Sequence, residues 1–326
     1  MIHHLFLSGL QAPQLLHIPD GFLSTPVALL GWLAALLIIA FALRQTRNQL
    51  GERQIPLLGV LAAFIFAAQA INFPVAGGTS GHLLGGALAA IVLGPWAAVL
   101  VMTAVIALQG LLFQDGGLLV MGWNIINMGV LTAFTGYLIY VFLRRVLGVN
   151  QRSLLIAGIM GAWCSVEVGA IATALQLALS GTSTLNIALP AMAGVHALIG
   201  IGEALITVGA LTLIARTRPD ILDQGAKAGG TSSAAWVTGG LVVSLVVAVF
   251  SFAASSSPDG LARVAEDHGF LAQAQGPLYN LLPDYTIPFI GNERISGIVA
   301  VVLGTLLVFA IALGVGRTLR GSKSAS

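Results

Sequence analysis

Charged residues are scarce in this sequence. Aspartate, glutamate, lysine and arginine together make up 8% of its 326 residues, whereas hydrophobic residues make up 57%. A soluble domain carries about 25% charged residues. The chain therefore has too few polar groups to cover a water-facing surface, which excludes a soluble globular fold and predicts a protein solvated mainly by lipid.

Other absences narrow the function. Cys164 is the single cysteine, so the chain forms no internal disulfide and no cysteine-based metal site. The sequence has no Gly-Lys-Ser or Gly-Lys-Thr run of a Walker A motif, no HExxH motif and no basic patch for nucleic acid. We therefore expect no ATP hydrolysis or other enzymatic activity in this chain, no resident cofactor and no nucleic-acid partner.

Apolar sequence, in contrast, is abundant. About nine apolar segments predict membrane-spanning helices, and hence an all-α polytopic membrane protein. The third segment is short and ends at Gly94-Pro95, which predicts a tight reversal; a bent or half-inserted element is the alternative. The nine segments are Pro26–Leu43, Ile55–Ile71, His82–Leu93, Pro95–Phe113, Trp123–Leu143, Ser153–Leu179, Leu189–Ala215, Ala234–Ala254 and Ile295–Leu319.

Basic residues cluster after alternate segments. If nine helices alternate in direction, these clusters fall on one side of the membrane, and only Arg263 and Arg294 fall on the other. The positive-inside rule assigns the basic side to the cytoplasm. This predicts an outside N-terminus and a cytoplasmic C-terminus. The clustered residues are Arg44, Arg47, Arg53, Arg144, Arg145, Arg152, Arg216, Arg218, Lys227, Arg317, Arg320 and Lys323.

A run rich in Gly and Ser at residues 220–233 divides the chain. Its composition predicts a flexible cytoplasmic linker. We expect residues 16–219 to form a seven-helix component, and residues 234–326 to form a two-helix module with a long external loop, Ser255–Arg294. Residues 1–15 are an N-terminal extension.

Two of the histidines lie at the predicted outer face. His17 precedes the first segment and His82 begins the third. Two imidazoles at one membrane face can share a metal ion, and imidazole suits Zn, Cu, Fe and Ni alike. A helix-start histidine bonded to backbone is the alternative for His82. The Gly-rich polar loop before it favours a ligand role, because glycine allows close backbone approach. We expect Asn72, Thr79 and Ser80 to orient the imidazole.

The segments around these histidines resemble a known family. His17–Ser24 (HIPDGFLS) and Asn72–Gly86 (NFPVAGGTSGHLLGG) are similar to two long motifs of the nickel/cobalt substrate-binding component of energy-coupling factor transporters. Gly94–Ala97 and Asn124–Gly129 also match its pattern. The resemblance runs from about residue 17 to residue 215.

The last third of the chain resembles the small two-helix partner of the same system, through Ser257–Leu261 (SPDGL) and Asp284-Tyr285. The two resemblances together imply a fusion that captures a divalent transition metal at the plasma or inner membrane. They imply uptake driven by separate ATPase subunits through a transmembrane coupling protein. The Pro-Asp-Gly-Leu type of partner favours nickel over cobalt.

The resemblance also implies a ligand set. In the family, four nitrogens hold the metal in a near-planar site: the N-terminal amine, the next backbone nitrogen, the imidazole of that residue and an imidazole from the Gly-rich loop. Carried over, these are the amine of Leu16, the backbone nitrogen and imidazole of His17, and the imidazole of His82. A tetragonal all-nitrogen set suits Ni(II) or Cu(II). We expect Asn127 to support this site from a second layer.

Ionisable residues also fall within predicted spans. His196 and Glu203 are seven residues apart and so share a helix face. Charges at membrane depth are rare and often functional, so we expect this pair to act in gating or coupling. A structural interhelical bond is the alternative, and it is our interpretation of Glu167.

Two other functions remain open. A self-sufficient, gradient-driven metal carrier or channel would use Glu167 and Glu203 as a proton relay. Uptake that survives loss of the ATPase but stops when the proton gradient collapses would favour it. An intramembrane metalloenzyme is less consistent with histidines at the membrane surface.

The family expects Met directly before the motif histidine, but Leu16 stands there. We hypothesise that the mature chain begins at residue 16, since a leucine codon can serve as initiator; a trimmed extension is the alternative. Mass spectrometry of the mature protein should find residue 16 first, with its amine beside His17. An intact Met1 terminus would contradict the hypothesis.

Overall fold

The computed structural model describes residues 17–51, 54–222, 233–279 and 281–321. Leu16, the N-terminal extension and most of the predicted linker lie outside these ranges. Within them the chain is mostly helical, and the predicted all-α polytopic class is confirmed. A two-stranded hairpin, β1 (Phe73–Val75) with β2 (Thr79–Gly81), is the exception.

Among the described residues, seven helices are long and apolar enough to cross a membrane. Two of them contain π-helical turns, η1 and η2, which are frequent at functional sites. In chain order, the seven are α1 (Thr25–Gln49), α4 (Pro95–Leu108) continued by η1 (Gln109–Phe113), α5 (Met121–Asn124) continued by η2 (Ile125–Leu131) and α6 (Thr132–Leu147), α7 (Gln151–Leu179), α8 (Leu185–Thr217), α10 (Ser233–Val249) continued by η3 (Phe250–Ala253), and α12 (Glu293–Gly321).

The second and third predicted segments are shorter than the others. The second forms α2 (Gln54–Gln69). The third forms only α3 (Gly86–Leu93), which begins four residues later than the predicted segment. Eight residues rise about 12 Å, too little to cross a hydrocarbon core of about 30 Å. Its limits are set by Gly85 and Gly94, whose φ angles of 82° and 84° only glycine adopts readily.

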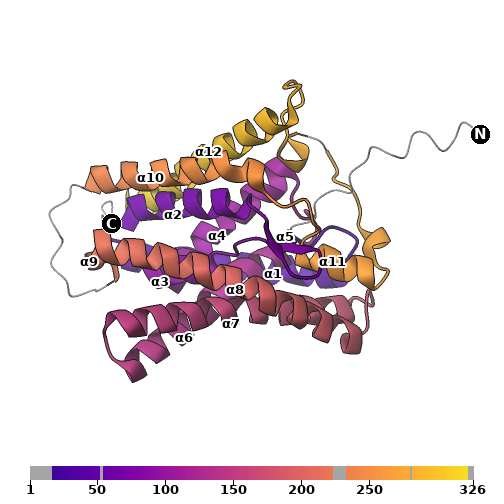
Figure 1. Ribbon diagram of the computed structural model, residues 1–326, viewed down its shortest axis with the longest axis horizontal. Coiled ribbons are helices and arrows are strands. Elements are labelled where there is room, and N and C mark those ends of the chain that lie inside the picture. Colours follow the sequence, from indigo (N-terminus) through magenta and orange to yellow (C-terminus); the bar gives the residue numbers. More distant parts are fainter. Residues whose placement is uncertain (1–16, 52–53, 223–232, 280, 322–326) are drawn as a thin grey trace, which may run out of the picture.

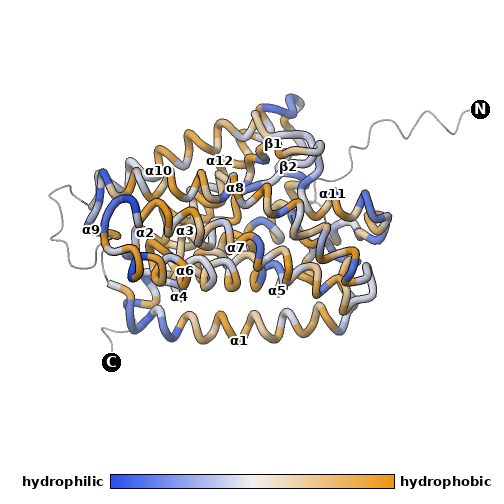
Figure 2. Tube along the Cα trace, turned by 60° about the horizontal axis from the view of Figure 1, so that its bottom comes forward, coloured by the Kyte–Doolittle hydropathy of each residue, from blue (hydrophilic) through white to orange (hydrophobic). Residues whose placement is uncertain are grey.

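The reversal predicted at Gly94-Pro95 is present. Gly94 ends α3 and Pro95 begins α4, where its missing N–H costs nothing, and the two helices then pack against each other. On the other side of α3 lies α6, which packs on α7, and α7 packs on α8 (Figure 1). The long helices run along a common direction. Hydrophilic residues gather mainly at the two ends of the bundle, with predominantly apolar stretches between them (Figure 2).

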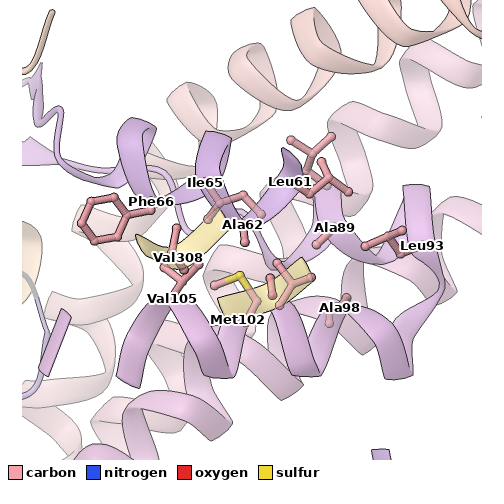
Figure 3. Packing of buried hydrophobic residues seen from close by; sticks show 14 of the residues in the cluster. Leu61, Ala62, Ile65, Phe66, Ala89, Leu93, Ala98, Met102, Val105 and Val308 are labelled. Atoms are coloured by element: carbon pink, nitrogen blue, oxygen red, sulfur yellow. The ribbon is translucent and has the colours of Figure 1, made fainter. Parts of the chain in front are cut away.

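The C-terminal module packs on α2. Helices α10 and α12 both lie beside α2 (Figure 1). Glycines permit the close approach: a side chain at Gly59 would meet Phe309, and one at Gly304 would meet Phe66. Figure 3 shows Phe66 near Val308 of α12. The module is therefore an integral part of the packed core.

Several short helices lie between the long ones. Helix α8 is followed by α9 (Pro219–Leu222), where the Arg218 guanidinium donates two hydrogen bonds to Asp220 at 2.7 and 2.8 Å. At the opposite end of the bundle lies α11 (Gly260–Asp267), followed by η4 (Leu271–Gln273) and η5 (Pro283–Tyr285) (Figure 1). Which end faces the cytoplasm stays a prediction from the basic clusters.

The Pro-Asp-Gly motif before α1 joins three segments. The Asp20 carboxylate accepts hydrogen bonds from the amides of residues 118, 119 and 120, at 3.1, 2.9 and 3.2 Å. The Asp20 carbonyl accepts from the amide of Gln275 at 2.8 Å. A side chain at Gly117 would collide with Asp20, so glycine is required there. This network fixes the segment that carries His17.

Asp20→Ala should lower the free energy of unfolding by about 2–3 kcal/mol, because three amides lose a charged acceptor. The measurement is thermal unfolding of the protein in detergent, followed by circular dichroism. Asp267→Ala is the matched control, since Asp267 is exposed and pairs only at the surface with Arg263, 3.0 Å away. Equal unfolding midpoints for the two variants would contradict the anchoring role of Asp20.

Candidate metal centre

The backbone that presents His17 is held by a side-chain amide. Asn124, at the end of α5, accepts from the Ile18 amide and donates to the Ile18 carbonyl, each at 3.1 Å. The amide of Gly117 donates to the same carbonyl at 2.9 Å. The residue that follows His17 is therefore clamped from two segments about a hundred positions further along the chain.

The His17 imidazole is oriented by Asp115. Its Nδ1 lies 3.0 Å from the Asp115 carbonyl and 3.4 Å from the Asp115 carboxylate. Both oxygens can only accept, so Nδ1 carries the hydrogen and Nε2 carries the lone pair. Nε2 is buried and has no hydrogen-bond partner among the described residues. Burial lowers the pKa of His17 below its ordinary value, against the opposing effect of Asp115, and keeps the ring neutral.

His82 follows the hairpin and is 4% exposed. Its Nδ1 lies 2.9 Å from the Leu83 carbonyl, which again places the lone pair on Nε2. The next two amides are held by a carboxylate from α8: Glu203 accepts from Leu84 at 2.6 Å and from Gly85 at 2.9 Å. Glu203 is fully buried, so this contact is strong and fixes the turn between His82 and α3.

The two imidazoles meet. Their ring centroids are 5.7 Å apart, with planes inclined at 78°. With metal–nitrogen bonds of about 2.1 Å, two imidazoles on one ion have centroids roughly 4.5–6.5 Å apart. Both rings line a cavity of about 60 Å³, and His196 and Asp259 also line it. The sequence-based prediction that distant segments bring His17 and His82 together agrees with this arrangement.

Two imidazoles need further donors to hold an ion tightly. No group of three or more His, Cys, Asp or Glu side chains within the described ranges is arranged to hold a metal. The resemblance predicts that the further donors are backbone nitrogens. A backbone nitrogen and the imidazole of the same histidine hold one ion through Nδ1, and in the structure Nδ1 of His17 faces Asp115. The predicted amine of Leu16 lies outside the described residues.

Three of the four residues predicted to support the imidazoles, Asn72, Thr79 and Ser80, lie in or beside the hairpin that precedes His82. Ser80 is bonded to the C-terminal module: its amide donates to Pro258 at 2.9 Å and its hydroxyl to Ser257 at 2.7 Å. The carbonyl of Asn72 accepts from Ser255 at 2.8 Å. Buried Thr79 belongs to β2. Ser80 and Asn72 thus join the hairpin to the module.

Asn127 lines the cavity from η2. Its amide exchanges two hydrogen bonds of 2.8 Å with the amide of Gln176 on α7, and also donates to Thr173 at 3.1 Å. These contacts define the orientation of the side chain in the cavity wall. Its predicted role in supporting the imidazoles stays a prediction.

The two residues predicted to act in gating, His196 and Glu203, have different surroundings in the structure. His196 faces the cavity, with Nδ1 bonded to the Met192 carbonyl at 2.8 Å. Glu203, by contrast, is occupied by the two amides after His82. Glu167 is only half-buried in α7, and one of its oxygens has no partner among the described residues. A functional role for His196 and Glu203 remains a prediction.

Three site residues were not singled out from the sequence as contributors to the site: Asp115, Asn124 and Asp259. Asp259, in the Pro-Asp-Gly turn of the C-terminal module, is 6% exposed and lines the cavity. Burial raises its pKa to about 6, while the nearby His82 opposes the shift. The sequence Pro-Asp-Gly occurs twice, at residues 19–21 and 258–260. This repetition was the signal that could have pointed to Asp259, because both turns adjoin the site.

Fold and site together define a polytopic membrane protein with paired buried histidines in a cavity. The chain belongs to the family described as the cobalt uptake substrate-specific transmembrane region, whose model matches residues 17–221. Residues 233–321 match the PDGLE domain. The chain is thus an M-type component fused to an N-type component, as the resemblance predicted.

Relatives share this two-part organisation. The putative fused nickel transport protein NikMN of Archaeoglobus fulgidus is 35% identical over 94% of this chain and 99% of its own length. The fused nickel transport protein NikMN of Rhodobacter capsulatus is 27% identical over 94% and 98%. A crystal structure of a truncated transition metal transporter is 32% identical with a TM-score of 0.55, covering 61% of this chain and 98% of that one.

Glu203→Gln should weaken Ni(II) binding about tenfold, because the new NH₂ group opposes one of the two amides that position the His82 turn. Calorimetric titration of the purified protein measures this, with radioactive nickel uptake by cells as the second readout. Glu167→Gln is the matched control, an uncharged variant of another carboxylate within the membrane-embedded helices. Unchanged binding with impaired uptake would instead support the gating role.

Proposed function

We propose that this protein captures a divalent transition metal with high affinity and takes it up across the plasma or inner membrane. The observation that carries the proposal is the 5.7 Å approach of the His17 and His82 rings. Both rings turn their Nδ1 toward a main-chain carbonyl, and both line one cavity. The metal is the transported substrate in this proposal.

Nickel is the proposed substrate rather than cobalt. Two buried imidazoles completed by backbone nitrogens form an all-nitrogen set, and a tetragonal arrangement of such donors suits Ni(II). Two relatives that align over nearly the whole chain carry nickel in their names. A relative from Geobacter sulfurreducens, 29% identical over 81% of both chains, is named for cobalt, so the test compares both metals.

The protein would act as the substrate-specific subunit of an energy-coupling factor transporter. The sequence contains no Walker A motif, so ATP would be hydrolysed by separate ATPase subunits coupled through a transmembrane protein. Release of the metal would follow a movement of the helical bundle driven by those partners. The binding of Glu203 to two amides supports this reading over a proton-driven carrier, which would need that carboxylate to exchange protons.

His82→Ala should weaken Ni(II) binding by more than about 100-fold, because loss of a ligand exceeds the 10–100-fold effect of losing a supporting residue. Calorimetric titration with Ni(II) and Co(II), using protein with its native N-terminus, measures the affinities. His268→Ala is the control, since His268 is an exposed histidine in the external loop. Equal affinities of the two variants would exclude the proposed site.

A further inference from the structure

The C-terminal module places a carboxylate in the wall of the metal cavity. Asp259 directly precedes α11, and its side chain is buried. Among the cavity-lining residues within the described ranges, Asp259 is the single one with an aspartate, glutamate, lysine or arginine side chain. The described wall of the cavity thus carries one acidic group and, apart from its histidines, no basic one.

Backbone pairing brings Asp259 close to His82. The amide of Ser80 donates to the Pro258 carbonyl at 2.9 Å, and the Ser80 hydroxyl donates to the Ser257 carbonyl at 2.7 Å. Ser80 and Asp259 also form a parallel bridge, so the module adds a short strand-like segment beside β2. Because Ser80 is two residues before His82, this pairing fixes the backbone of Asp259 near the second predicted metal ligand.

The residue after Asp259 has to be glycine. A side chain at Gly260 would lie 2.7 Å from Ile199 and 3.0 Å from His196, both on α8. Carbon atoms do not approach one another to 2.7 Å, so the missing side chain allows the turn to lie close against α8. Helix α11 also packs on α8. The backbone that carries Asp259 is therefore held between the hairpin and α8.

One oxygen of the Asp259 carboxylate, Oδ1, is buried and has no hydrogen-bond partner among the described residues. The arginine of α11, Arg263, pairs instead with Glu266 and Asp267 at the surface, at 3.8 and 3.0 Å. A buried carboxylate that is incompletely paired destabilises a fold, and a cation placed beside it removes that cost. The cavity wall is thus arranged to favour a bound cation.

The predicted ligand set leaves a charge on the ion to be balanced. An amine and two imidazoles are neutral when they bind a metal, whereas a backbone nitrogen binds only after it loses its proton. A divalent ion held by these four nitrogens keeps one positive charge, whichever nitrogen of each imidazole is used. A carboxylate at short range stabilises that charge in a buried cavity.

Asp115 is the other buried carboxylate near the site. It accepts a hydrogen bond of 2.7 Å from the Tyr285 hydroxyl and is not one of the cavity-lining residues. Asp259 is therefore the carboxylate better placed to act on an ion in the cavity.

We propose that Asp259 supplies the negative charge that balances the metal ion captured by His17 and His82. The proposal rests on the proposed function. It gives Asp259 no place among the nitrogen donors, because no group of three metal-binding side chains occurs within the described ranges. It assigns the C-terminal module a direct part in the affinity of the site, through charge.

The test is a calorimetric Ni(II) titration of the purified full chain with its native N-terminus, carrying Asp259→Asn. This substitution removes the charge, keeps the size of the side chain and should retain α11, because asparagine precedes helices as readily as aspartate. We expect Ni(II) to bind about tenfold more weakly or worse, since a close opposite charge changes such an equilibrium by about 10-fold or more.

Asp267→Asn is the matched control on the same helix. Asp267 is exposed and pairs with Arg263 at the surface, so this variant should bind Ni(II) within about twofold of the unaltered protein.

Thermal unfolding without metal separates the charge from a structural role. Removing an incompletely paired buried carboxylate should leave the unfolding midpoint unchanged or raise it, whereas loss of a structural contact would lower it. Unchanged Ni(II) affinity of Asp259→Asn would overturn the proposal, and so would a lower midpoint of the metal-free variant.

If Asp259→Asn does not fold, Asp259→Ser decides by the same two measurements, because serine also lacks the charge and suits the start of a helix. Failure of both variants to fold would show a structural role and overturn the proposal. Absence of Ni(II) binding by the unaltered protein would instead refute the proposed function.

Discussion

Each site histidine directs its Nδ1 hydrogen to a main-chain carbonyl, and the rest of the site depends on this interaction. The hydrogen bond decides the tautomer, so the lone pair is carried by Nε2. Burial keeps the His17 ring neutral, because a buried imidazolium loses its hydration. The surrounding contacts of Asp20, Asn124 and Glu203 place the backbone from which the two rings extend.

The C-terminal module contacts the part of the bundle that carries His17 and His82, and it also packs on α2. Its strand-like segment at residues 255–259 bonds the hairpin before His82, and Asp259 lines the cavity. Tyr285 bonds the residue that orients His17. Its helices α10 and α12 meanwhile pack on α2 through glycines, which fixes both ends of the loop between them. Fusion of the two components suits this arrangement, because one chain keeps both at a fixed ratio.

Several polar residues that the sequence predicted to support the site form hydrogen bonds with other segments of the chain. Ser80 and Asn72 lie in the loop that carries His82, but their described hydrogen bonds lead to the C-terminal module. Glu203 shares a helix face with His196, as a period of 3.6 residues requires, yet its carboxylate binds the turn after His82. Spacing along a helix predicts a face, whereas the partner on that face depends on which segment packs there.

Composition and periodicity by themselves determined that this chain is an all-helical membrane protein, because too little charge is present for water to solvate it. The motifs around residues 17 and 82 predicted the two histidines as partners, and their rings lie 5.7 Å apart in the structure. Only the tertiary structure decided that α3 is too short to span, because hairpin pairing and two left-handed glycines limit it. It alone placed Asp115 beside His17 and Tyr285 beside Asp115, since no local pattern records a contact between residues 98 or more positions apart.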